Sequence, residues 1–265
     1  MPTLVEFFNR EVAQELVAQG RRADVIHGHN VLAHVADLNG VVAGISLLLK
    51  PDGVAIIEAP YVRQMIENVE FDTIYHEHLC YFSLTALDHL FRRHGLAVID
   101  VAQVPIHGGS LRITVGAEQA PSEHVHALLA EEERLGLDRL AYYTAFGDRV
   151  AALREQLLQV LRDLKAEGNR IAVYGASAKG STLLNYFGIG QETIDYVVDR
   201  STAKQGRFTP GTHLPIYAPQ RLVEDRPDYV LLLTWNFADE ILAQQAEYRQ
   251  LGGRFIIPIP APVIV

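Results

Sequence analysis

Residues 171–180 read Ile-Ala-Val-Tyr-Gly-Ala-Ser-Ala-Lys-Gly. The apolar run at 171–174 predicts a buried strand, and the apolar spacing that follows predicts a helix over 179–186. The glycine between them permits a tight turn from strand to helix. A strand that passes directly into a helix is the repeating unit of a parallel sheet, so this stretch predicts an α/β domain in the C-terminal part of the chain.

The residues that follow repeat this alternation. Apolar runs separated by helical patterns indicate a parallel sheet with helices on both faces. The further expected strands are 196–198, 229–233 and 255–258, and the further expected helices are 219–224 and 238–251.

The residues before 171 predict a linker and a second, mixed region. From 122 to 167 apolar residues recur at helical spacing, so we expect a helical link between two domains. Ahead of it, the short connection between the expected strands 97–104 and 111–115 favours antiparallel pairing. Closer to the N-terminus we expect strands at 3–8, 23–27 and 54–57, helices at 10–18 (capped by Asn9), 37–49 and 84–94, and a turn at 50–53.

The composition is that of a globular protein and excludes several classes. Among 265 residues, 23 Lys and Arg stand against 32 Asp and Glu, a net charge of −9 that argues against binding to nucleic acid or an anionic membrane. Cys80 is the single cysteine, so an intrachain disulfide or a cysteine-based zinc site is impossible. The apolar stretch Val41–Leu49 is far shorter than the roughly 20 residues that span a membrane. We expect a soluble, cytoplasmic protein.

Polar side chains gather after the expected strands of the N-terminal half, where open parallel sheets bind their ligands. His27, His29, Asn30 and His34 follow one strand, and Glu58 follows the next. We therefore expect these residues to border a functional site.

The loop Tyr75-His76-Glu77-His78 adds further titratable groups. A histidine, a carboxylate and a phenol within reach of each other suffice to remove a proton beside a carbonyl. The alternative is a solvated loop whose side chains bond to the backbone. Histidine pairs of this spacing can also bind zinc or iron, but pairs arise readily among 11 histidines, and we predict no metal site. A serine hydrolase is disfavoured, because His107-Gly108-Gly109-Ser110 has no accompanying Gly-x-Ser-x-Gly elbow.

In the C-terminal half, the turn Gly175–Gly180 has the features of a phosphate site. A helix N-terminus favours an anion, and Lys179 adds a positive charge. Asp199 ends the next expected strand, where a ribose hydroxyl can be held. Trp235 and Asn236 follow a later strand and face the same crevice, so the indole could stack on a base or sugar. The alternative is a tight structural turn with a surface lysine.

These same residues carry a family resemblance. The motifs are Asn30–His34, Tyr75–His78 with Tyr81-Phe82-Ser83, His107–Arg112 and Gly175–Gly180. They resemble those of the S-adenosylmethionine-dependent sugar C-methyltransferases, which act at C-3 of nucleotide-linked 4-keto-deoxysugars. The resemblance extends from Thr3 to about Pro260, nearly the whole chain.

The resemblance implies a mechanism and a set of site residues. A base removes the proton at C-3, beside the C-4 ketone, and the enolate attacks the methyl group of S-adenosylmethionine. His78 corresponds to the base, with Tyr75, Glu77 and His34 in the same pocket. The remaining implied or expected site residues are Asn30 and Leu32 for the cofactor, and Ser177, Lys179, Gly180, Trp235 and Asn236 for the nucleotide-linked keto sugar.

Together these expectations give a two-domain α/β protein. Residues 1–116 are expected to form an incomplete class I methyltransferase domain (Rossmann-like), 117–168 a helical linker, and 169–265 a second Rossmann-like α/β domain that binds the nucleotide sugar. The resembling enzymes carry an N-terminal cysteine-rich zinc domain and a glycine-rich cofactor loop that this sequence lacks, so we expect a truncated enzyme, with a homo-oligomer as one possibility. A non-catalytic nucleotide-sugar-binding module and an NAD-linked sugar oxidoreductase are the alternatives.

Overall fold

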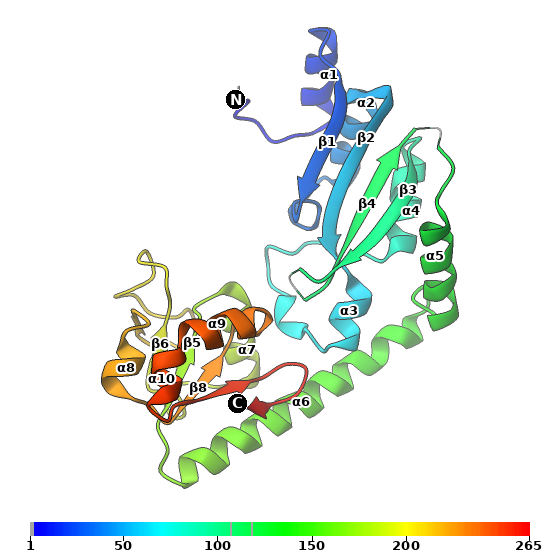
Figure 1. The fold of residues 1–265 in the computed structure, drawn as a ribbon. Coiled ribbons are helices and arrows are strands. Elements are labelled where there is room, and N and C mark those ends of the chain that lie inside the picture. Colours follow the sequence, from blue (N-terminus) through cyan, green and yellow to red (C-terminus); the bar gives the residue numbers. More distant parts are fainter. Residues whose placement is uncertain (1–2, 107, 118) are drawn as a thin grey trace. The chain divides into compact units, whose positions relative to one another are not determined.

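The computed structural model describes residues 3–106, 108–117 and 119–265. Its internal contacts divide the chain into two compact units (Figure 1). Unit 1 comprises residues 1–65 and 76–144, and unit 2 comprises residues 66–75 and 145–265. The expected 117–168 linker is thus divided between the units, and residues 66–75 belong with the C-terminal part of the chain.

Unit 1 contains a four-stranded sheet in the order β1-β2-β4-β3. β1 and β2 are parallel, whereas β4 is antiparallel to both β2 and β3, as expected for the last pair. The strands are β1 (Ala23–His29), β2 (Leu49–Pro60), β3 (Ala97–Val104) and β4 (Ser110–Gly116). The helices are α1 (Arg10–Ala18), α2 (Leu38–Leu48), α3 (Val62–Glu67, whose last residues pass into unit 2), α4 (Leu84–Arg93) and α5 (Glu123–Leu135), with a short 3-10 helix η1 (Leu32–His34).

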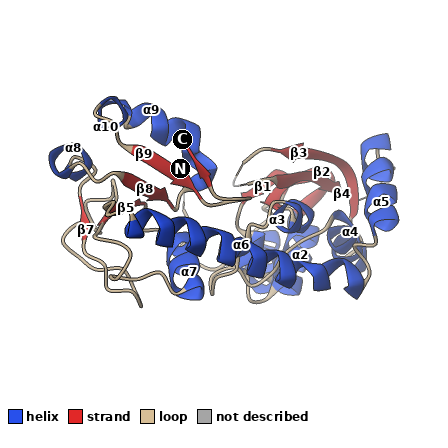
Figure 2. Ribbon diagram, turned by 90° about the horizontal axis from the view of Figure 1, so that it is seen from below, coloured by secondary structure: helices blue, strands red, loops and turns tan. Residues whose placement is uncertain are grey.

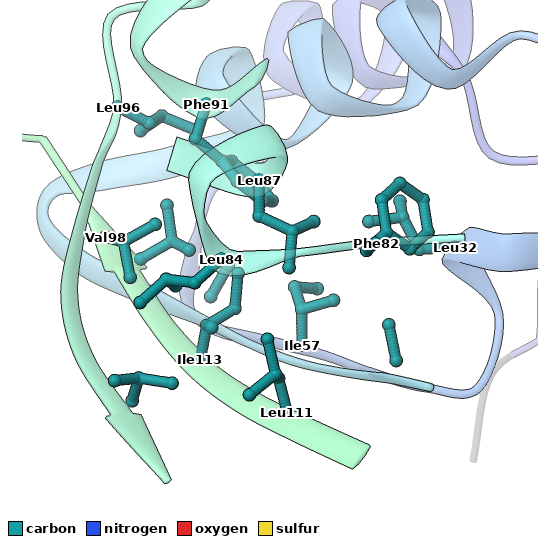
Figure 3. Close-up of a cluster of buried hydrophobic side chains, with 14 of the residues drawn as sticks. Leu32, Ile57, Phe82, Leu84, Leu87, Phe91, Leu96, Val98, Leu111 and Ile113 are labelled. Carbon is teal, nitrogen blue, oxygen red and sulfur yellow. The ribbon is translucent and has the colours of Figure 1, made fainter. Parts of the chain in front are cut away.

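The core of unit 1 lies where α4 packs on the sheet (Figure 3). Leu84, Leu87 and Phe91 recur at helical spacing, so they share one face of α4, and all three are fully buried. Alternate residues of the strands, such as Ile57 and Ile113, meet them because side chains alternate across a strand. This packing fixes the end of the sheet that carries the polar loops.

A buried carboxylate attaches α5 to this core. Glu132 has 0% of its surface exposed, and its two oxygens accept hydrogen bonds from the backbone N–H groups of Leu84 and Thr85 at 2.7 and 2.8 Å. They also accept from the hydroxyls of Tyr61 and Thr85 at 2.8 and 2.6 Å. The carboxylate therefore caps the N-terminus of α4, where a negative charge is favoured.

Unit 2 contains a six-stranded sheet in the order β10-β9-β8-β5-β6-β7, parallel except for β10. The strands are β5 (Ile171–Tyr174), β6 (Val197–Val198), β7 (Ile216–Tyr217), β8 (Tyr229–Leu232), β9 (Arg254–Ile257) and β10 (Val263–Ile264). The helices are α6 (Leu140–Ala166, whose first residues fall in unit 1), α7 (Ala178–Phe187), α8 (Arg221–Asp225), α9 (Ala238–Gln244) and α10 (Ala246–Gln250), and the 3-10 helices are η2 (Phe71–Thr73) and η3 (Trp235–Phe237).

Helices cover both faces of this sheet, as the alternating pattern predicts (Figure 2). Val173 packs with α6 and α7 on one face, and its neighbour Tyr174 packs with α8, α9 and α10 on the other. The chain runs from β5 through β6 to β7 and then returns to β8 on the opposite side of β5. The switch point of the sheet therefore lies between β5 and β8, where open α/β sheets bind ligands. The predicted α/β class, with Rossmann-like sheets, is confirmed.

Two local predictions in the N-terminal half are wrong. Residues 3–8 form no strand: Val5 and Phe7 are 90% and 94% exposed, and a strand needs a neighbour to pair with. The turn expected at 50–53 lies within β2, where the register against β1 shifts. Gly53 fits there because a Cβ atom would lie 2.8 Å from the carbonyl oxygen of Ala23.

Candidate functional site

The carboxyl ends of β1 and β2 bring together three charged or titratable side chains in unit 1. Glu58 is 2% exposed, and its Oε2 accepts hydrogen bonds from Nε and Nη2 of Arg112 at 3.1 and 2.9 Å. Nδ1 of His29 lies 3.6 Å from the same oxygen. Glu58 and Arg112 face each other in the β2–β4 register, so the guanidinium compensates the buried carboxylate.

The structure places His34 and His78 against each other. The backbone N–H of Leu79 donates to the carbonyl of Ala33 at 2.8 Å, which holds the 76–83 loop on η1. The imidazole rings of His34 and His78 then meet edge to face with their centroids 4.8 Å apart, and Tyr81 approaches His78 with a centroid distance of 6.2 Å. Two of the histidines that the sequence singled out, His34 and His78, thus form a pair.

The other two predicted catalytic residues occupy different surroundings. Glu77 and its neighbour His76 have exposed side chains, whereas Tyr75 and His78 are half-buried. Tyr75 is the last residue of the 66–75 segment, which packs in unit 2, and His76 begins the part of the loop that belongs to unit 1. The four-residue motif therefore starts in one unit and ends in the other.

An apolar cavity of about 900 Å³ runs along β1 in unit 1. Leu32 lines it together with Gly28 and Val31, which follow the strand. Asn30 lies between Gly28 and Val31 in sequence and has φ +54°, and its side-chain oxygen is buried without a hydrogen-bond partner among the described residues. A buried acceptor without a partner, next in sequence to residues that line an apolar cavity, is a candidate to pair with the amino group of a flat ring such as adenine.

In unit 2, the turn Gly175–Gly180 engages most of its polar groups in contacts that stabilise the turn and the start of α7. The hydroxyl of Ser177 caps α7 by accepting from the N–H of Gly180 at 3.1 Å. Gly180 packs against Leu233, the residue that follows β8, and a Cβ at Gly180 would lie 2.8 Å from its Cδ1. Gly175 has φ +100°, which only glycine adopts readily. The sequence of the turn is thus explained largely by capping and close packing.

Lys179 and Trp235 contact each other on the α6/α7 face of the sheet. Nζ of Lys179 lies 4.8 Å from the centre of the Trp235 ring, and it is buried without a hydrogen-bond partner in the described structure. The indole Nε1 of Trp235 donates to Oδ2 of Asp72 at 2.7 Å. Burial lowers the pKa of Lys179, and the carboxylates of Asp72 and Glu70 oppose that shift. Lys179 therefore keeps unused donors that an anion could accept.

The residues expected to hold a ribose or a base are arranged differently. The two oxygens of Asp199 accept from the backbone N–H groups of Ala176 and Ser201 at 2.7 and 2.8 Å, so this carboxylate ties the loops together. An NAD-linked function needs such a carboxylate for the ribose, and this engagement disfavours that alternative. Asn236 lies half-buried in η3, directly after Trp235.

The weaker alternatives gain no support from the described residues. No group of three or more histidine, cysteine or acidic side chains within 3–106, 108–117 and 119–265 could hold a metal ion. The hydroxyl of Ser110 donates to the carbonyl of Ile106 at 3.1 Å, whereas His107, expected beside it, lies outside the described residues. Among the described helices, none has the length and apolar character needed to cross a membrane.

Sequence reasoning missed Asp72 and the pairing of Glu58 with Arg112. Asp72 lies in Glu70-Phe71-Asp72-Thr73, which carries no periodic or motif signal. Arg112 could have been found from the expected β3–β4 pair, because it is a charged residue inside an apolar strand.

Comparison with known families matches both halves of the chain. Residues 105–260 match the family described as C-methyltransferase C-terminal domain, and residues 3–101 match a methyltransferase domain. C-methyltransferase NovU of Streptomyces niveus is 40% identical over 268 residues, which cover 99% of this chain and 63% of NovU. The chain thus spans less than two thirds of the length of this curated relative.

Solved structures similar to the chain cover smaller parts of it. An O-methyltransferase family protein from Burkholderia thailandensis covers 41% of this chain and is itself covered to 34%, with 19% identity and a TM-score of 0.30. The LepI complex with SAM covers 37% of this chain and is covered to 27%, with 12% identity and a TM-score of 0.32. The family assignment rests on the sequence matches, which extend through both units: the chain belongs to the C-methyltransferases, a family of S-adenosylmethionine-dependent methyltransferases.

Proposed function

We propose that the protein transfers a methyl group from S-adenosylmethionine to C-3 of a nucleotide-linked 4-keto-deoxysugar. The observation that carries this proposal is the contact between His34 and His78, two histidines of motifs that resemble those of the sugar C-methyltransferases. Membership in the C-methyltransferase family supports the formation of a carbon–carbon bond. Such a bond requires a carbon nucleophile, and a ketone beside C-3 makes the proton there acidic enough for a protein base.

His78 is the proposed base. A neutral imidazole near pH 7 suits removal of a proton beside a carbonyl. The ring of His78 is held by His34 on one side and approached by Tyr81 on another, which limits its rotation. The hydroxyl of Tyr75, three residues earlier, is the proposed donor to the developing enolate oxygen, and Glu77 is the proposed carboxylate of the same catalytic set.

The proposed reaction breaks a C–H bond and a sulfur–methyl bond and forms one carbon–carbon bond. An imidazole nitrogen of His78 takes the C-3 proton, and the electrons of the broken C–H bond form the enolate with the oxygen at C-4. The C-3 carbon then forms a bond to the methyl carbon, and the electrons of the sulfur–methyl bond remain on sulfur. S-adenosylmethionine supplies the electrophilic methyl group, and Asn30 and Leu32 are the residues proposed for its adenine end, supported by the unpaired oxygen of Asn30 and by the cavity that Leu32 lines.

Unit 2 is the proposed nucleotide-sugar domain. Support comes from its parallel sheet, whose switch point lies between β5 and β8 beside the N-terminus of α7. Ser177 and Gly180 shape the turn, Lys179 offers unused donors to a phosphate, and Trp235 and Asn236 follow β8 at the same end of the sheet. These five residues remain the proposed substrate-binding set.

Deuterium exchange at C-3 tests the proposal directly. The chain is incubated in D₂O with a nucleoside-diphosphate-linked 4-keto-6-deoxyhexose, and incorporation is followed by NMR with and without S-adenosylmethionine. Exchange at C-3, followed by methylation when the donor is added, is the expected result. Nucleotide-sugar binding without any exchange would identify a binding module instead, and binding of NAD would favour the oxidoreductase.

A further inference from the structure

The segment Ile66–Tyr75 is separated in sequence from the rest of unit 2 but packs within it. Its ring of Phe71 stacks on Phe187 of α7 with a centroid distance of 4.7 Å and an interplanar angle of 18°. Phe71 itself is 5% exposed. The guanidinium of Arg149 on α6 donates to the backbone carbonyls of Ile66 and Glu67. The segment is thus held by side chains from two helices of the unit.

Asp72 provides a third attachment of the segment to the rest of unit 2, and it is the attachment made by a charged side chain of the segment. Its side chain is completely buried, and Oδ2 accepts the 2.7 Å hydrogen bond from the indole of Trp235, while Oδ1 has no hydrogen-bond partner within the described part of the chain. The Lys179 ammonium lies over the same indole. Burial raises the pKa of Asp72 to about 6, and the Trp235 hydrogen bond and the Lys179 charge oppose that shift. A buried carboxylate is costly unless its partners are well placed, so this arrangement selects one position of the segment.

We propose that Asp72 is a positioning residue that, through its hydrogen bond to Trp235, fixes the Ile66–Tyr75 segment and thereby orients Tyr75. Only two residues separate Asp72 from Tyr75, so a displacement of η2 shifts the backbone of the proposed enolate-oxygen donor. The part of the inference that concerns Tyr75 rests on the proposed function. The part that concerns attachment of the segment rests on the contacts alone.

The attachment is tested by hydrogen–deuterium exchange of the peptide that covers 66–75. Asp72→Ala removes the acceptor, Trp235→Phe removes the donor and keeps a ring, and Asp72→Asn keeps an acceptor without the charge. The matched control is Tyr248→Phe, which removes another buried hydrogen bond of unit 2, from the Tyr248 hydroxyl to the carbonyl of Pro227 at 2.8 Å.

Asp72→Ala and Trp235→Phe are expected to accelerate exchange in 66–75 by roughly ten- to hundredfold, as for loss of a hydrogen bond to a charged group, with the rest of unit 2 unchanged. The double variant should add little to either single one, because both remove the same interaction. Trp235 is the only tryptophan, so its emission should shift to longer wavelength in Asp72→Ala and stay near wild type in Asp72→Asn. If residues 66–75 exchange no faster in Asp72→Ala and Trp235→Phe than in the control Tyr248→Phe, the proposed attachment is refuted.

The link to catalysis has a separate readout. In the deuterium wash-in assay, Asp72→Ala should lower kcat at least tenfold with little change in KM for the sugar. Asp72→Asn should keep most of the wild-type kcat. If the wild-type chain shows no exchange at C-3, the proposed function fails while the peptide data still decide the attachment. If Asp72→Ala frees the segment yet exchanges C-3 at the wild-type rate, the positioning of Tyr75 is refuted.

Discussion

The imidazole of His78 meets the imidazole of His34 edge to face at a centroid distance of 4.8 Å. His34 lies in η1 and His78 in the 76–83 loop of unit 1, and the hydrogen bond from the N–H of Leu79 to the carbonyl of Ala33 joins the two segments. This backbone bond holds the residue next to His78 against η1. The relationship gives His78 a defined orientation and leaves His76 exposed.

Replacement of His78 should therefore affect proton abstraction far more than replacement of His76. We expect His78→Ala to lower the rate of deuterium incorporation at C-3 by about 10²- to 10⁴-fold, the range for loss of a general base. Substrate affinity should change little, because the lost interaction acts mainly in the transition state. His76→Ala is the control and should keep most of the rate. Loss of exchange in His76→Ala with retention in His78→Ala would reassign the base.

Glu132 should contribute strongly to the stability of unit 1. Glu132→Ala leaves the buried donors from Tyr61, Leu84 and Thr85 without an acceptor, so we expect it to lower the free energy of unfolding by at least about 3 kcal/mol. Glu133→Ala, on the exposed side of the same helix, should change it by less than about 0.5 kcal/mol. Urea unfolding followed by circular dichroism measures both, and equal effects would contradict the capping role.

The pair of Arg112 with Glu58 makes a similar prediction at the sheet. Arg112→Met removes both side-chain hydrogen bonds that the described residues give the buried Glu58 carboxylate and leaves the more distant His29 beside it, so the free energy of unfolding should fall by roughly 2–3 kcal/mol. Because Arg112 is half-exposed, this loss of free energy of unfolding should be smaller than the loss expected for a fully buried ion pair. Arg139→Met removes an exposed pair with Asp138 in the connection between α5 and α6 and should cost no more than about 0.5 kcal/mol. A loss for Arg112→Met as small as the Arg139→Met value would show that water compensates Glu58.

The stability of unit 2 should fall as pH rises from about 4 to 7. Burial raises the pKa of Asp72 to about 6 and that of Glu70 to about 7, above their values in an unfolded chain. The folded state therefore binds protons more tightly in this window, and the stabilisation present below pH 4 is lost as pH rises through the two folded-state values. The midpoint of urea unfolding, read from Trp235 emission between pH 4 and 8, checks this.

Two variants isolate the source of that pH dependence. Asp72→Asn should flatten the profile, because it removes one of the two titrating groups. Asp225→Asn is the control: a hydrogen bond from Arg170 lowers the pKa of Asp225, so its stabilisation is lost only in acid below about pH 4, and the slope between pH 4 and 7 should stay as in the wild type. An Asp72→Asn profile as steep as that of the wild type would show that other groups control the pH response.

Local patterns determined the elements of this protein. The strand, turn and helix at 171–187 form as expected, because an apolar run and a capping serine act within a few residues of each other. The same holds for α4, because its N-cap Ser83 and the residues of its apolar face lie in consecutive turns of the helix. The strand predicted at 3–8 does not form, because β-propensity is a local property and a strand also needs a neighbouring strand to pair with.

The tertiary structure alone decided which distant residues meet. No local pattern joins Asp72 to Trp235, which lies 163 positions later, and none predicts that 66–75 packs with the C-terminal unit. The sequence identified Lys179 and Trp235 as candidates for a ligand, whereas the fold showed that they also surround a buried carboxylate. The physical reason is that hydrophobic periodicity and capping are short-range, while the pairing of a buried charge depends on the path of the backbone through every intervening turn.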